Sequence, residues 1–370
     1  MKVPFVDLPE QIEGLKGELR PILEDVVFNR ADFIMRQDLI DFENHFAQFS
    51  GVNHAIGVAN GSDALNLAVK VLGIGAGDEV ITVSHTFVAT IAAIYHAGAT
   101  PVLVDVGDDY NIEVAKIEEA ITSKTKAIIA VNLNGRTCDM DELFKVANRY
   151  DLFVIEDSAQ AIGAKYNGRQ AGSFGILSTY SFYPFKIIGC FGDGGMITTD
   201  SSELEYKLRC LRDNGQDRKK GEILYYGWNS RLDNLQAAIL DLMLKNITGF
   251  IKKRRDIANL YQDGLPKTEG LTLPPGPTEE GKYFDVFQNY VIRTKRRNEL
   301  VEYLNDHGIG TLISWPIPTH FHNNLELKKY KLPNTENISN EVVSIPMSTV
   351  VSEEQAAYVV EVINSFFLGN

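Results

Sequence analysis

From Gly51 onward, short apolar runs alternate with longer amphipathic stretches. The apolar runs are bounded by turn residues, as buried strands are, and the stretches between them have the apolar spacing of helices. The expected strands are 79–83, 101–106, 126–131, 152–155, 176–182 and 196–199, and the expected helices are 63–72, 87–96, 112–121, 140–150 and 203–211. This alternation predicts an α/β fold with a large, mainly parallel, seven-stranded type of sheet and helices on both faces. In such sheets, ligands bind at the carboxyl ends of the strands.

The segments on either side of this region have a different pattern. Residues 10–49 have helical apolar spacing and predict an N-terminal arm that packs on the body. A long helix is expected from Arg231 to about Gly249, leading out of the large unit. The elements expected beyond it are strands at 285–294 and 310–314 and helices at 296–307 and 353–367. We therefore predict two domains, a large α/β domain over 1–249 and a smaller C-terminal α+β domain over 250–370.

Composition and charge exclude several classes of function. The chain has 370 residues and a net charge of -13, which argues against nucleic-acid binding. Cys138, Cys190 and Cys210 are far apart and lack metal-ligand spacing, so we expect a reducing compartment and no metal. The sequence has no apolar run of about 18 residues and no signal-peptide pattern, so we predict a cytoplasmic protein that does not span a membrane.

The stretch from Ser181 to Gly195 contains the first candidate for chemistry. Lys186 lies there between a block of aromatic and apolar residues and a glycine cluster. In a partly dry pocket the pKa of its amine would fall, and the amine would become a nucleophile. Taken alone, the pattern fits an ordinary solvated lysine before a glycine turn better. Other parts of the chain must therefore decide between the two interpretations.

The segment Asn60–Leu65 opens a helix after a turn. Backbone N–H groups at a helix start are free and lie at the positive end of the helix dipole, so they can bind a phosphate group. The alternative is an ordinary helix start that is capped by Ser62 or Asp63. A P-loop is excluded, because no Gly-Lys-Ser/Thr follows.

A second group of polar residues follows the apolar strand at 152–155. Asp157 could hold the proton of a pyridine nitrogen there, which would make the ring an electron sink. Gln160 offers an amide to the same space, and Phe87 could stack on an aromatic ring. The alternatives are a carboxylate that caps the next segment and a phenylalanine of the core.

Two more segments combine polar and aromatic residues. The segment Gly227–Asp233 carries an amide, a hydroxyl and a guanidinium, but it also resembles a capped helix start with Ser230 as the cap. The proline-stiffened loop from Ser314 to His320 could line a substrate mouth. His85 and His322 are expected to be ordinary solvated side chains.

Together these features resemble the DegT/StrS group of nucleotide-sugar aminotransferases. The resemblance runs over essentially the whole chain, and its most specific motifs are Asn60–Leu65 (NGSDAL), Glu156–Ala161 (EDSAQA), Ser181–Lys186 (SFYPFK) with Gly192–Gly195 (GDGG), and Asn229–Asp233 (NSRLD). It implies the aspartate-aminotransferase-like fold (fold type I), pyridoxal 5'-phosphate as cofactor, and a homodimer with shared active sites.

The resemblance also assigns roles to individual residues. Lys186 would hold the cofactor as a Schiff base and later move a proton, and Asp157 would pair with the pyridine nitrogen. The other implied cofactor contacts are Gln160 to the ring hydroxyl, Phe87 to the ring face, and Gly61, Ser62, Ser181 and, across the dimer, Asn229 to the phosphate. The implied substrate contacts are Tyr183, Lys219, Trp315 and His320, with Lys219 near the nucleotide diphosphate.

The implied reaction moves an amino group from L-glutamate to a nucleotide-linked ketosugar. The pattern from Lys186 to Gly195 resembles the subgroup that aminates carbon 3 of a 6-deoxy sugar on a dTDP carrier, giving a 3-amino-3,6-dideoxyhexose. Amination of carbon 4 stays open, because Asn132–Gly135 and Ser314–Trp315 depart from the common pattern in the substrate pocket. A pyridoxamine-dependent dehydratase typically has histidine in place of Lys186, and a non-catalytic regulator with this fold is a further alternative.

Overall fold

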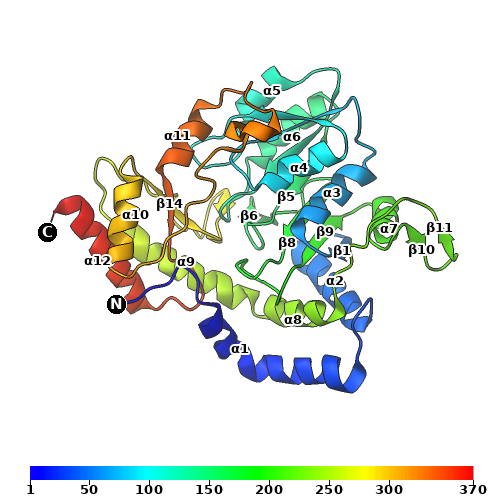
Figure 1. The fold of residues 1–370 in the computed structure, drawn as a ribbon, viewed down its shortest axis with the longest axis horizontal. Helices are drawn as coiled ribbons and strands as arrows, with labels where there is room; N and C mark the ends of the chain where they lie inside the picture. Colours follow the sequence, from blue (N-terminus) through cyan, green and yellow to red (C-terminus); the bar gives the residue numbers. More distant parts are fainter. Residues whose placement is uncertain (370) are drawn as a thin grey trace.

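Figure 1 shows the computed structural model, which describes residues 1–369. Within that range, the largest sheet has seven strands in the order β1-β9-β8-β5-β4-β2-β3. The strands are β1 His54–Val58, β2 Glu79–Val83, β3 Thr100–Val104, β4 Thr125–Val131, β5 Phe153–Asp157, β8 Leu177–Ser181 and β9 Gly195–Thr199. Strand β9 is antiparallel to β1 and β8, and all other neighbours are parallel. The predicted large and mainly parallel sheet is confirmed.

Helices cover both faces of this sheet, as predicted. One face packs against α3 (Gly61–Val71), α4 (Val88–His96) and α7 (Ser202–Leu211). The other face packs against α6 (Met140–Arg149), which contributes Leu143 and Val146 to the core. Because both faces are buried, β4 is a continuous apolar run from Ala127 to Val131 without polar alternation.

The N-terminal arm consists of α1 (Leu8–Leu23), a π-helical turn (Glu24–Arg30) and α2 (Gln37–Ser50). The chain turns between them at Ala31, whose φ of 51° is left-handed. Helix α2 packs against α8 (Asn234–Lys245). Its Phe42 and Phe46 rings lie 5.5 and 5.6 Å from the ring of Phe182, so the arm supports the stretch that carries Lys186.

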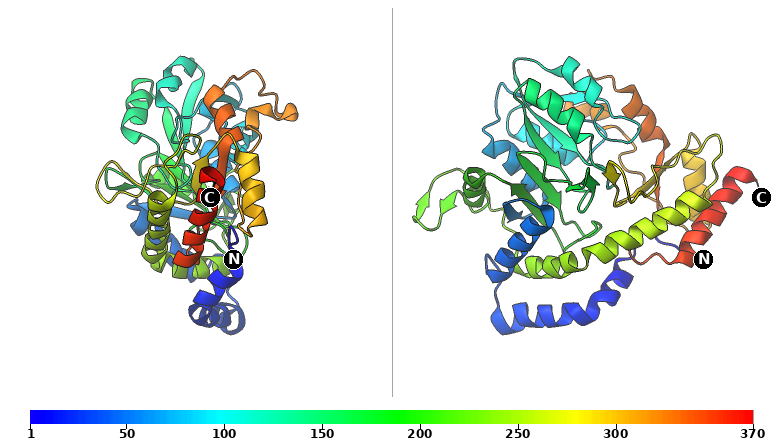
Figure 2. Two further views of the ribbon diagram at one scale, coloured as in Figure 1. Left: turned by 90° about the vertical axis from the view of Figure 1, so that its left-hand side faces the viewer. Right: turned by 180° about the vertical axis from the view of Figure 1, so that it is seen from behind.

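The predicted helix over 231–249 is wrong in its bounds. The structure has two successive helices there, α8 and α9 (Ile247–Gly264), which meet at Asn246. Figure 2 shows α9 running from the side of the large sheet to the second unit. The predicted domain boundary at residues 249 and 250 falls in the first turn of α9, and the division into two domains stays a prediction.

The second unit contains an antiparallel pair of strands with helices around it. The elements are β13 Tyr290–Arg293, β14 Val342–Ile345, α10 Arg297–Asp306, α11 Pro333–Glu341 and α12 Glu353–Leu368. The predicted strand at 285–294 is shorter, because residues 285–289 take an irregular path with Phe287 at a left-handed φ of 52°. The predicted strand at 310–314 is absent from the described structure: Leu312 forms only an isolated bridge to Ser344.

Short elements complete the chain. They are a 3-10 turn Val114–Lys116, α5 Ile117–Ala120, β6 Lys165–Tyr166, β7 Arg169–Gln170, β10 Gln216–Asp217, β11 Glu222–Ile223, β12 Tyr283–Phe284, and 3-10 turns Thr319–Phe321 and Asn323–Leu325. The predicted helix at 112–121 is thus reduced to two short turns. Strand β12 pairs with β6, which ties the second unit to the large one. Among residues 1–369, no helix is both long and apolar enough to cross a membrane.

Candidate active site

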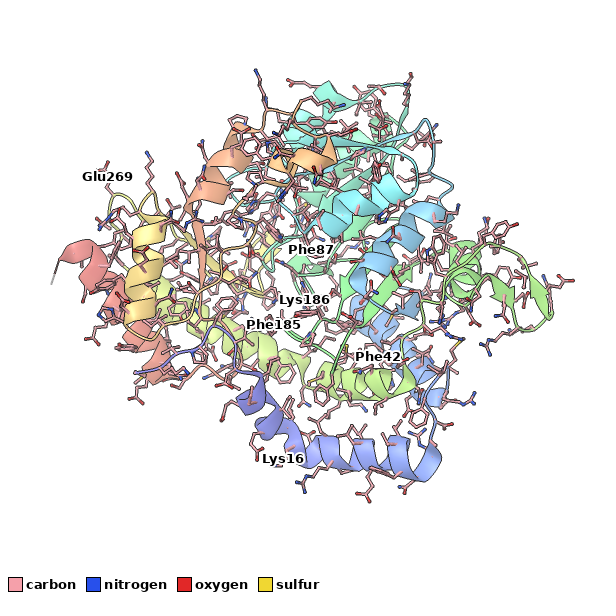
Figure 3. All side chains as sticks on the ribbon, in the orientation of Figure 1. Lys16, Phe42, Phe87, Phe185, Lys186 and Glu269 are labelled. Carbon is pink, nitrogen blue, oxygen red and sulfur yellow. The ribbon has the colours of Figure 1, made fainter. Side chains whose placement is uncertain are left out.

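Lys186 lies in the loop between β8 and β9, beyond the carboxyl end of β8. Figure 3 shows it in the middle of the molecule, between the large sheet and the second unit. The side chain is half-buried, and this burial lowers the pKa of its amine to about 8, although the negative charge of Asp157 acts in the opposite direction. The neutral form of the amine, which a nucleophile requires, is therefore much more abundant near physiological pH than in an ordinary lysine. The structure supports a partly dry pocket and contradicts a freely solvated lysine.

Asp157 is the last residue of β5 and is 5% exposed. Burial raises the pKa of its carboxyl, while hydrogen bonds and the nearby charge of Lys186 lower it. Thr90 Oγ1 donates to Oδ2 at 2.8 Å, and the Ala159 N–H donates to Oδ1 at 3.3 Å. The carboxylate thus keeps the capacity to accept a further charge-assisted bond from a cationic ring nitrogen.

Thr90 is a site residue that the sequence analysis missed. It lies one turn inside α4, three positions after Phe87, and its side chain is fully buried. Thr86 Oγ1 and Thr90 Oγ1 are 2.9 Å apart, so a short chain of hydroxyls ends on Asp157. The sequence carried no clear local signal for Thr90, because it lies among the apolar residues of α4.

The turn before α3 and the end of β8 lie against each other. Asn60, rather than Ser62 or Asp63, caps α3 by accepting the Asp63 N–H at 2.8 Å. No residue of 1–369 accepts a hydrogen bond from the N–H groups of Gly61 and Ser62. A Cβ on Gly61 would lie 2.9 Å from the Cβ of Ser181, so the Ser181 side chain closes on this helix start. Two free N–H groups and a hydroxyl therefore meet where a phosphate could bind.

The glycine run after Lys186 has a packing role. A Cβ on Gly195 would lie 2.4 Å from the backbone of Asn60, and a Cβ on Gly194 would lie 2.9 Å from Cys190 Sγ. Gly195 thus lets β9 approach the turn at Asn60, and Gly194 lets the chain pass close to Cys190, because a larger side chain would not fit at either position.

Gln160 and Asn134 meet at the carboxyl ends of β5 and β4. The Asn134 N–H donates to Gln160 Oε1 at 3.0 Å, which directs the Gln160 amide group. Asn132 is fully buried and bonded to Glu156, Ser158 and Cys138, so it stabilises the turn. Phe87, at the start of α4, is 59% exposed, so its ring is not part of the core.

The predicted substrate residues Trp315 and His320 of the second unit both contact the segment that follows β2. His320 is fully buried, with Nδ1 at 2.7 Å from Ser84 Oγ and Nε2 at 3.3 Å from Glu336 Oε1. A direct substrate contact would require His320 to leave these partners. Trp315 is half-buried at a left-handed φ of 51°, and its ring is T-shaped to His85 at 5.2 Å. Tyr183 is 49% exposed beside Lys186.

His85 is not the solvated side chain that the sequence suggested. It is 2% exposed, its Nδ1 has no hydrogen-bond partner among residues 1–369, and burial lowers its pKa to about 4. The segment after β2 lies under Trp315, and this contact between distant parts of the chain buries the ring. His322 is exposed, as expected.

Lys219 and Asn229 belong to the segment between α7 and α8. Lys219 is exposed at the tip of the β10–β11 hairpin, which projects from one side of the molecule (Figure 1). Asn229 is also exposed, and its only pairing is an isolated bridge to Asp213. Ser230 does not cap α8: the helix starts at Asn234, and Ser230 Oγ instead accepts the Ala59 N–H at 3.3 Å. Among residues 1–369, no hydrogen bond or ion pair joins Lys219 or Asn229 to Lys186.

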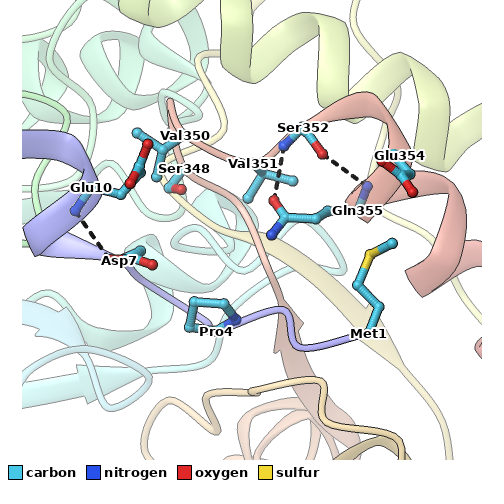
Figure 4. A pocket seen from close by; sticks show the side chains of 10 residues that line it. All are labelled: Met1, Pro4, Asp7, Glu10, Ser348, Val350, Val351, Ser352, Glu354 and Gln355. Atoms are coloured by element: carbon cyan, nitrogen blue, oxygen red, sulfur yellow. Dashed lines mark hydrogen bonds between the residues drawn. The ribbon is translucent and has the colours of Figure 1, made fainter. Parts of the chain in front are cut away.

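A pocket of about 400 Å³ lies elsewhere, between the N-terminal segment and the start of α12 (Figure 4). It is lined by Asp7, Glu10, Ser352, Gln355 and six other residues. Ser352 and Gln355 bond to each other in a capping box, which starts α12. None of the predicted site residues lines this pocket, so the presence of a pocket does not by itself identify the active site.

The groups around Lys186 fit pyridoxal phosphate. The cofactor has an aldehyde, a pyridine nitrogen and a phosphate, which call for an amine, a carboxylate and a set of N–H and O–H donors. Lys186 and Asp157, which interact through their charges, and the Gly61–Ser62 turn, which contacts Ser181, provide these groups at the carboxyl ends of neighbouring parts of the sheet.

Comparisons with known proteins agree with this fit. The model of the DegT/DnrJ/EryC1/StrS aminotransferase family matches residues 24–364. A "pleiotropic regulatory protein" of Geobacillus stearothermophilus is 42% identical over 99% of both chains. A "dTDP-3-amino-3,6-dideoxy-alpha-D-galactopyranose transaminase" of Aneurinibacillus thermoaerophilus is 43% identical over 98% of this chain and 99% of its own.

Solved structures agree as well. DesV of S. venezuelae, in complex with a ketimine intermediate, has a TM-score of 0.94 at 37% identity, over 99% of this chain and 98% of its own. NtdA of Bacillus subtilis, with the cofactor PMP bound, has a TM-score of 0.90 at 30% identity, over 98% of this chain and 84% of its own. The predicted fold, cofactor and aminotransferase activity are thereby confirmed. The chain belongs to the DegT/DnrJ/EryC1/StrS aminotransferase family and is a pyridoxal-phosphate-dependent enzyme.

Proposed function

We propose that this aminotransferase moves the amino group of L-glutamate to a nucleotide-linked 3-keto-6-deoxyhexose, carried by dTDP. The observation that supports the reaction best is the half-buried amine of Lys186, with its pKa lowered to about 8 and with Asp157 facing it. The pairing of an easily deprotonated amine with a buried carboxylate suits a site that must both bond to a carbonyl and keep a pyridine ring protonated.

In this proposal, the protein side chains hold the cofactor and move one proton. The bound cofactor supplies an electron sink for the carbon that loses or gains the amino group. Lys186 Nζ holds the cofactor covalently and, once displaced by the amino donor, carries a proton to and from that carbon. Asp157 keeps the proton on the ring nitrogen, and the N–H groups of Gly61 and Ser62 with the Ser181 hydroxyl bind the phosphate.

The choice of carbon 3 rests on similarity. The Aneurinibacillus relative is named for a 3-amino-3,6-dideoxy sugar on dTDP, and it matches this chain from end to end. The pattern from Lys186 to Gly195 resembles the same subgroup. We therefore expect the keto group at carbon 3.

A comparison of candidate substrates tests both the carbon that is aminated and the nucleotide carrier. The purified enzyme is offered L-glutamate with 3-keto or 4-keto dTDP-6-deoxysugars and with the matching UDP sugars, and the aminated products are identified by mass spectrometry and NMR. We expect amination of the 3-keto dTDP sugar. Preferential amination of a 4-keto sugar would contradict the choice of carbon, and a preference for UDP would contradict the choice of carrier.

We further propose that the enzyme is a homodimer with Asn229 reaching the phosphate in the other subunit's site. Large apolar side chains next to Asn229 are exposed in the single chain: Tyr226 is 99%, Ile223 77% and Trp228 39% exposed. Such a group of exposed apolar side chains supports burial against a partner. The exposed Phe87 fits the same arrangement.

Mixing two inactive variants tests the shared site. Lys186→Ala and Asn229→Ala chains are denatured together and refolded, so that heterodimers form with one complete site. If Asn229 acts across the dimer, the mixture recovers about a quarter of the wild-type activity, because about half of the dimers are mixed and each has one intact site. If ultracentrifugation shows a dimer but the mixture recovers no activity, Asn229 belongs to the site of its own chain instead.

A further inference from the structure

Gln288 forms hydrogen bonds on both sides of Lys186. The Ile187 N–H donates to Gln288 Oε1 at 3.1 Å, and Gln288 Nε2 donates to the Phe185 carbonyl at 2.9 Å. These two groups belong to the peptide units immediately before and after Lys186. Because peptide units are planar, holding both of them fixes the backbone angles of Lys186 and therefore the direction of its side chain.

The segment that carries Gln288 is itself held firmly. The side chain of Gln288 is 7% exposed. Arg254 of α9, which is 3% exposed, donates from Nη1 to the carbonyls of Phe287 at 3.0 Å and Gln288 at 3.2 Å. On the other side, a Cβ on Gly135 would lie 2.7 Å from the Gln288 nitrogen, so the turn after β4 packs directly on this segment.

The loop around Lys186 has few other constraints at this point. The Lys186 N–H donates to the Tyr183 carbonyl at 2.8 Å and forms a turn, and Gly189 packs on the backbone of Pro184. No other group of residues 1–369 bonds to the Phe185 carbonyl or the Ile187 N–H. The Gln288 amide therefore provides the hydrogen bonds that join the peptide units of Lys186 to the second unit.

We propose that Gln288 is a positioning residue for the cofactor lysine: it reaches from the second unit to clamp the two peptide units that flank Lys186. This inference rests on the proposed role of Lys186. The clamp keeps the amine in its half-buried position, so that it meets the cofactor carbonyl in a reactive orientation. The clamp also makes the orientation of Lys186 depend on the position of the second unit, because α9 holds the segment that carries Gln288.

The chain offers a matched control in Gln236 of α8. Its amide also makes two bonds to the same loop: it accepts the Phe191 N–H at 2.8 Å and donates to the Phe191 carbonyl at 3.1 Å. Both bonds are made to one residue, five positions after Lys186, and neither touches a peptide unit of the lysine. Comparing the two glutamines therefore separates positioning of Lys186 from general stiffness of the loop.

The test follows cofactor capture without any sugar substrate. Full-length enzyme is freed of cofactor, mixed with pyridoxal phosphate at a series of pH values, and the visible absorbance band of the lysine-bound cofactor is followed by stopped flow. In the wild type the rate should rise with pH, with a midpoint near the Lys186 pKa of about 8, since only the neutral amine reacts. The variants are Gln288→Met and Gln236→Met, which keep side-chain size and remove the amide.

We expect Gln288→Met to lower the plateau rate about tenfold and to move the midpoint upward, toward the value of a solvated lysine, as water enters the loosened loop. Gln236→Met should change the plateau rate by no more than about twofold and should leave the midpoint where it is in the wild type. Equal rates and midpoints in wild type and Gln288→Met, or equal losses in the two variants, would overturn the proposal. Melting curves verify that the variants are folded.

A second variant covers the case in which Gln288→Met does not fold. Gln288→Glu keeps the acceptor for Ile187 but loses the donor to Phe185, and its added negative charge also raises the pKa of the lysine. Because this charge shifts the midpoint with or without the clamp, the plateau rate decides: a plateau rate several-fold below that of the wild type supports the clamp, and an unchanged plateau rate contradicts it. If wild-type enzyme forms no band, or if Lys186→Ala keeps it, the proposed function fails and the inference fails with it. A normal wild-type band with unaffected Gln288 variants overturns the inference alone.

Discussion

Two neighbouring carboxylates at the carboxyl end of β5 have opposite surroundings. On one side of the strand, Glu156 is fully buried and is surrounded by donors of its own chain. These donors are the N–H groups of Gly172 (2.8 Å), Phe174 (2.7 Å) and Gly175 (2.8 Å), the Ser178 hydroxyl (3.2 Å) and the Asn132 amide (3.1 Å). On the other side, Asp157 has one hydroxyl and one N–H, and burial raises the pKa of its carboxyl.

The difference separates a structural carboxylate from a functional one. The chain provides Glu156 with enough donors to offset its desolvation, so its charge stabilises the fold. The chain leaves Asp157 short of donors, so a ligand with a cationic group gains more from it than the fold does. An unfavourable buried group of this kind is typical of sites where stability is given up for function.

The largest effect should come from removing the amine that faces Asp157. Lys186→Ala leaves no group to hold the cofactor covalently or to move the proton, so turnover and the visible absorbance band should both be lost. Activity assays and absorbance spectra of cofactor-saturated protein measure this. Turnover that persists in cofactor-saturated Lys186→Ala would show that the reaction does not need Lys186. The contrast between Asp157 and Glu156 would then have no functional meaning.

The Asp157→Asn variant should lose most activity and yet fold more stably. Turnover should fall on the order of a thousandfold, because the neutral amide does not keep the ring nitrogen protonated. The pKa of Asp157 is higher in the folded protein than in the unfolded chain, so its carboxyl favours folding at low pH and this advantage is lost as the pH rises. The cofactor-free variant should therefore melt above the wild type, by a larger margin at about pH 7 than at about pH 4. A lower melting temperature would mean that Asp157 supports the fold as Glu156 does.

The reverse result is expected for Glu156→Gln. The new NH₂ group would face backbone donors, so at least one hydrogen bond to a charged acceptor is lost, at a cost of about 2–3 kcal/mol in the free energy of unfolding. Urea denaturation measures this loss, and the absorbance band should form normally in the folded fraction. A Glu156→Gln variant with wild-type stability but no absorbance band would mean that Glu156, and not Asp157, is the carboxylate that serves the cofactor.

The smallest effect is expected at Lys219, which lies on neither side of the strand. Lys219→Ala should raise the KM for the nucleotide sugar several-fold through the loss of one exposed charge contact, worth about 1 kcal/mol. The rate of the half-reaction with glutamate should stay the same, as rapid-mixing spectra can verify. Equal damage to the glutamate half-reaction would contradict a role confined to the nucleotide.

Residues on the large sheet were easier to predict than those on the loops around it. Lys186, Asp157 and the Gly61–Ser62 turn follow strands or precede a helix, and the ends of parallel strands meet at one edge of a sheet. Local sequence therefore places them together. Thr90 was missed because a threonine inside an apolar helix resembles any other core residue until its partner is known. Gln288 was missed because it lies in a segment that the apolar pattern assigned to a strand.

The error at His85 has the same origin. His85 has a polar side chain in a loop segment, which favours exposure when the sequence is considered alone. The structure buries it, because the end of β2 packs against the loop before α11 across more than 200 positions of sequence. Such long-range contacts leave no local pattern.

The sequence by itself determined the α/β sheet, the helices on its two faces and the order of the motifs that carry the chemistry. These follow from the period of apolar residues and from the types of residue at strand and helix ends, which are local properties. Only the tertiary structure decided which of two adjacent carboxylates keeps free capacity, how deeply Lys186 is buried, and that Gln288 clamps it. These depend on desolvation and on hydrogen bonds between residues far apart in the chain, and both exist only once the chain has folded.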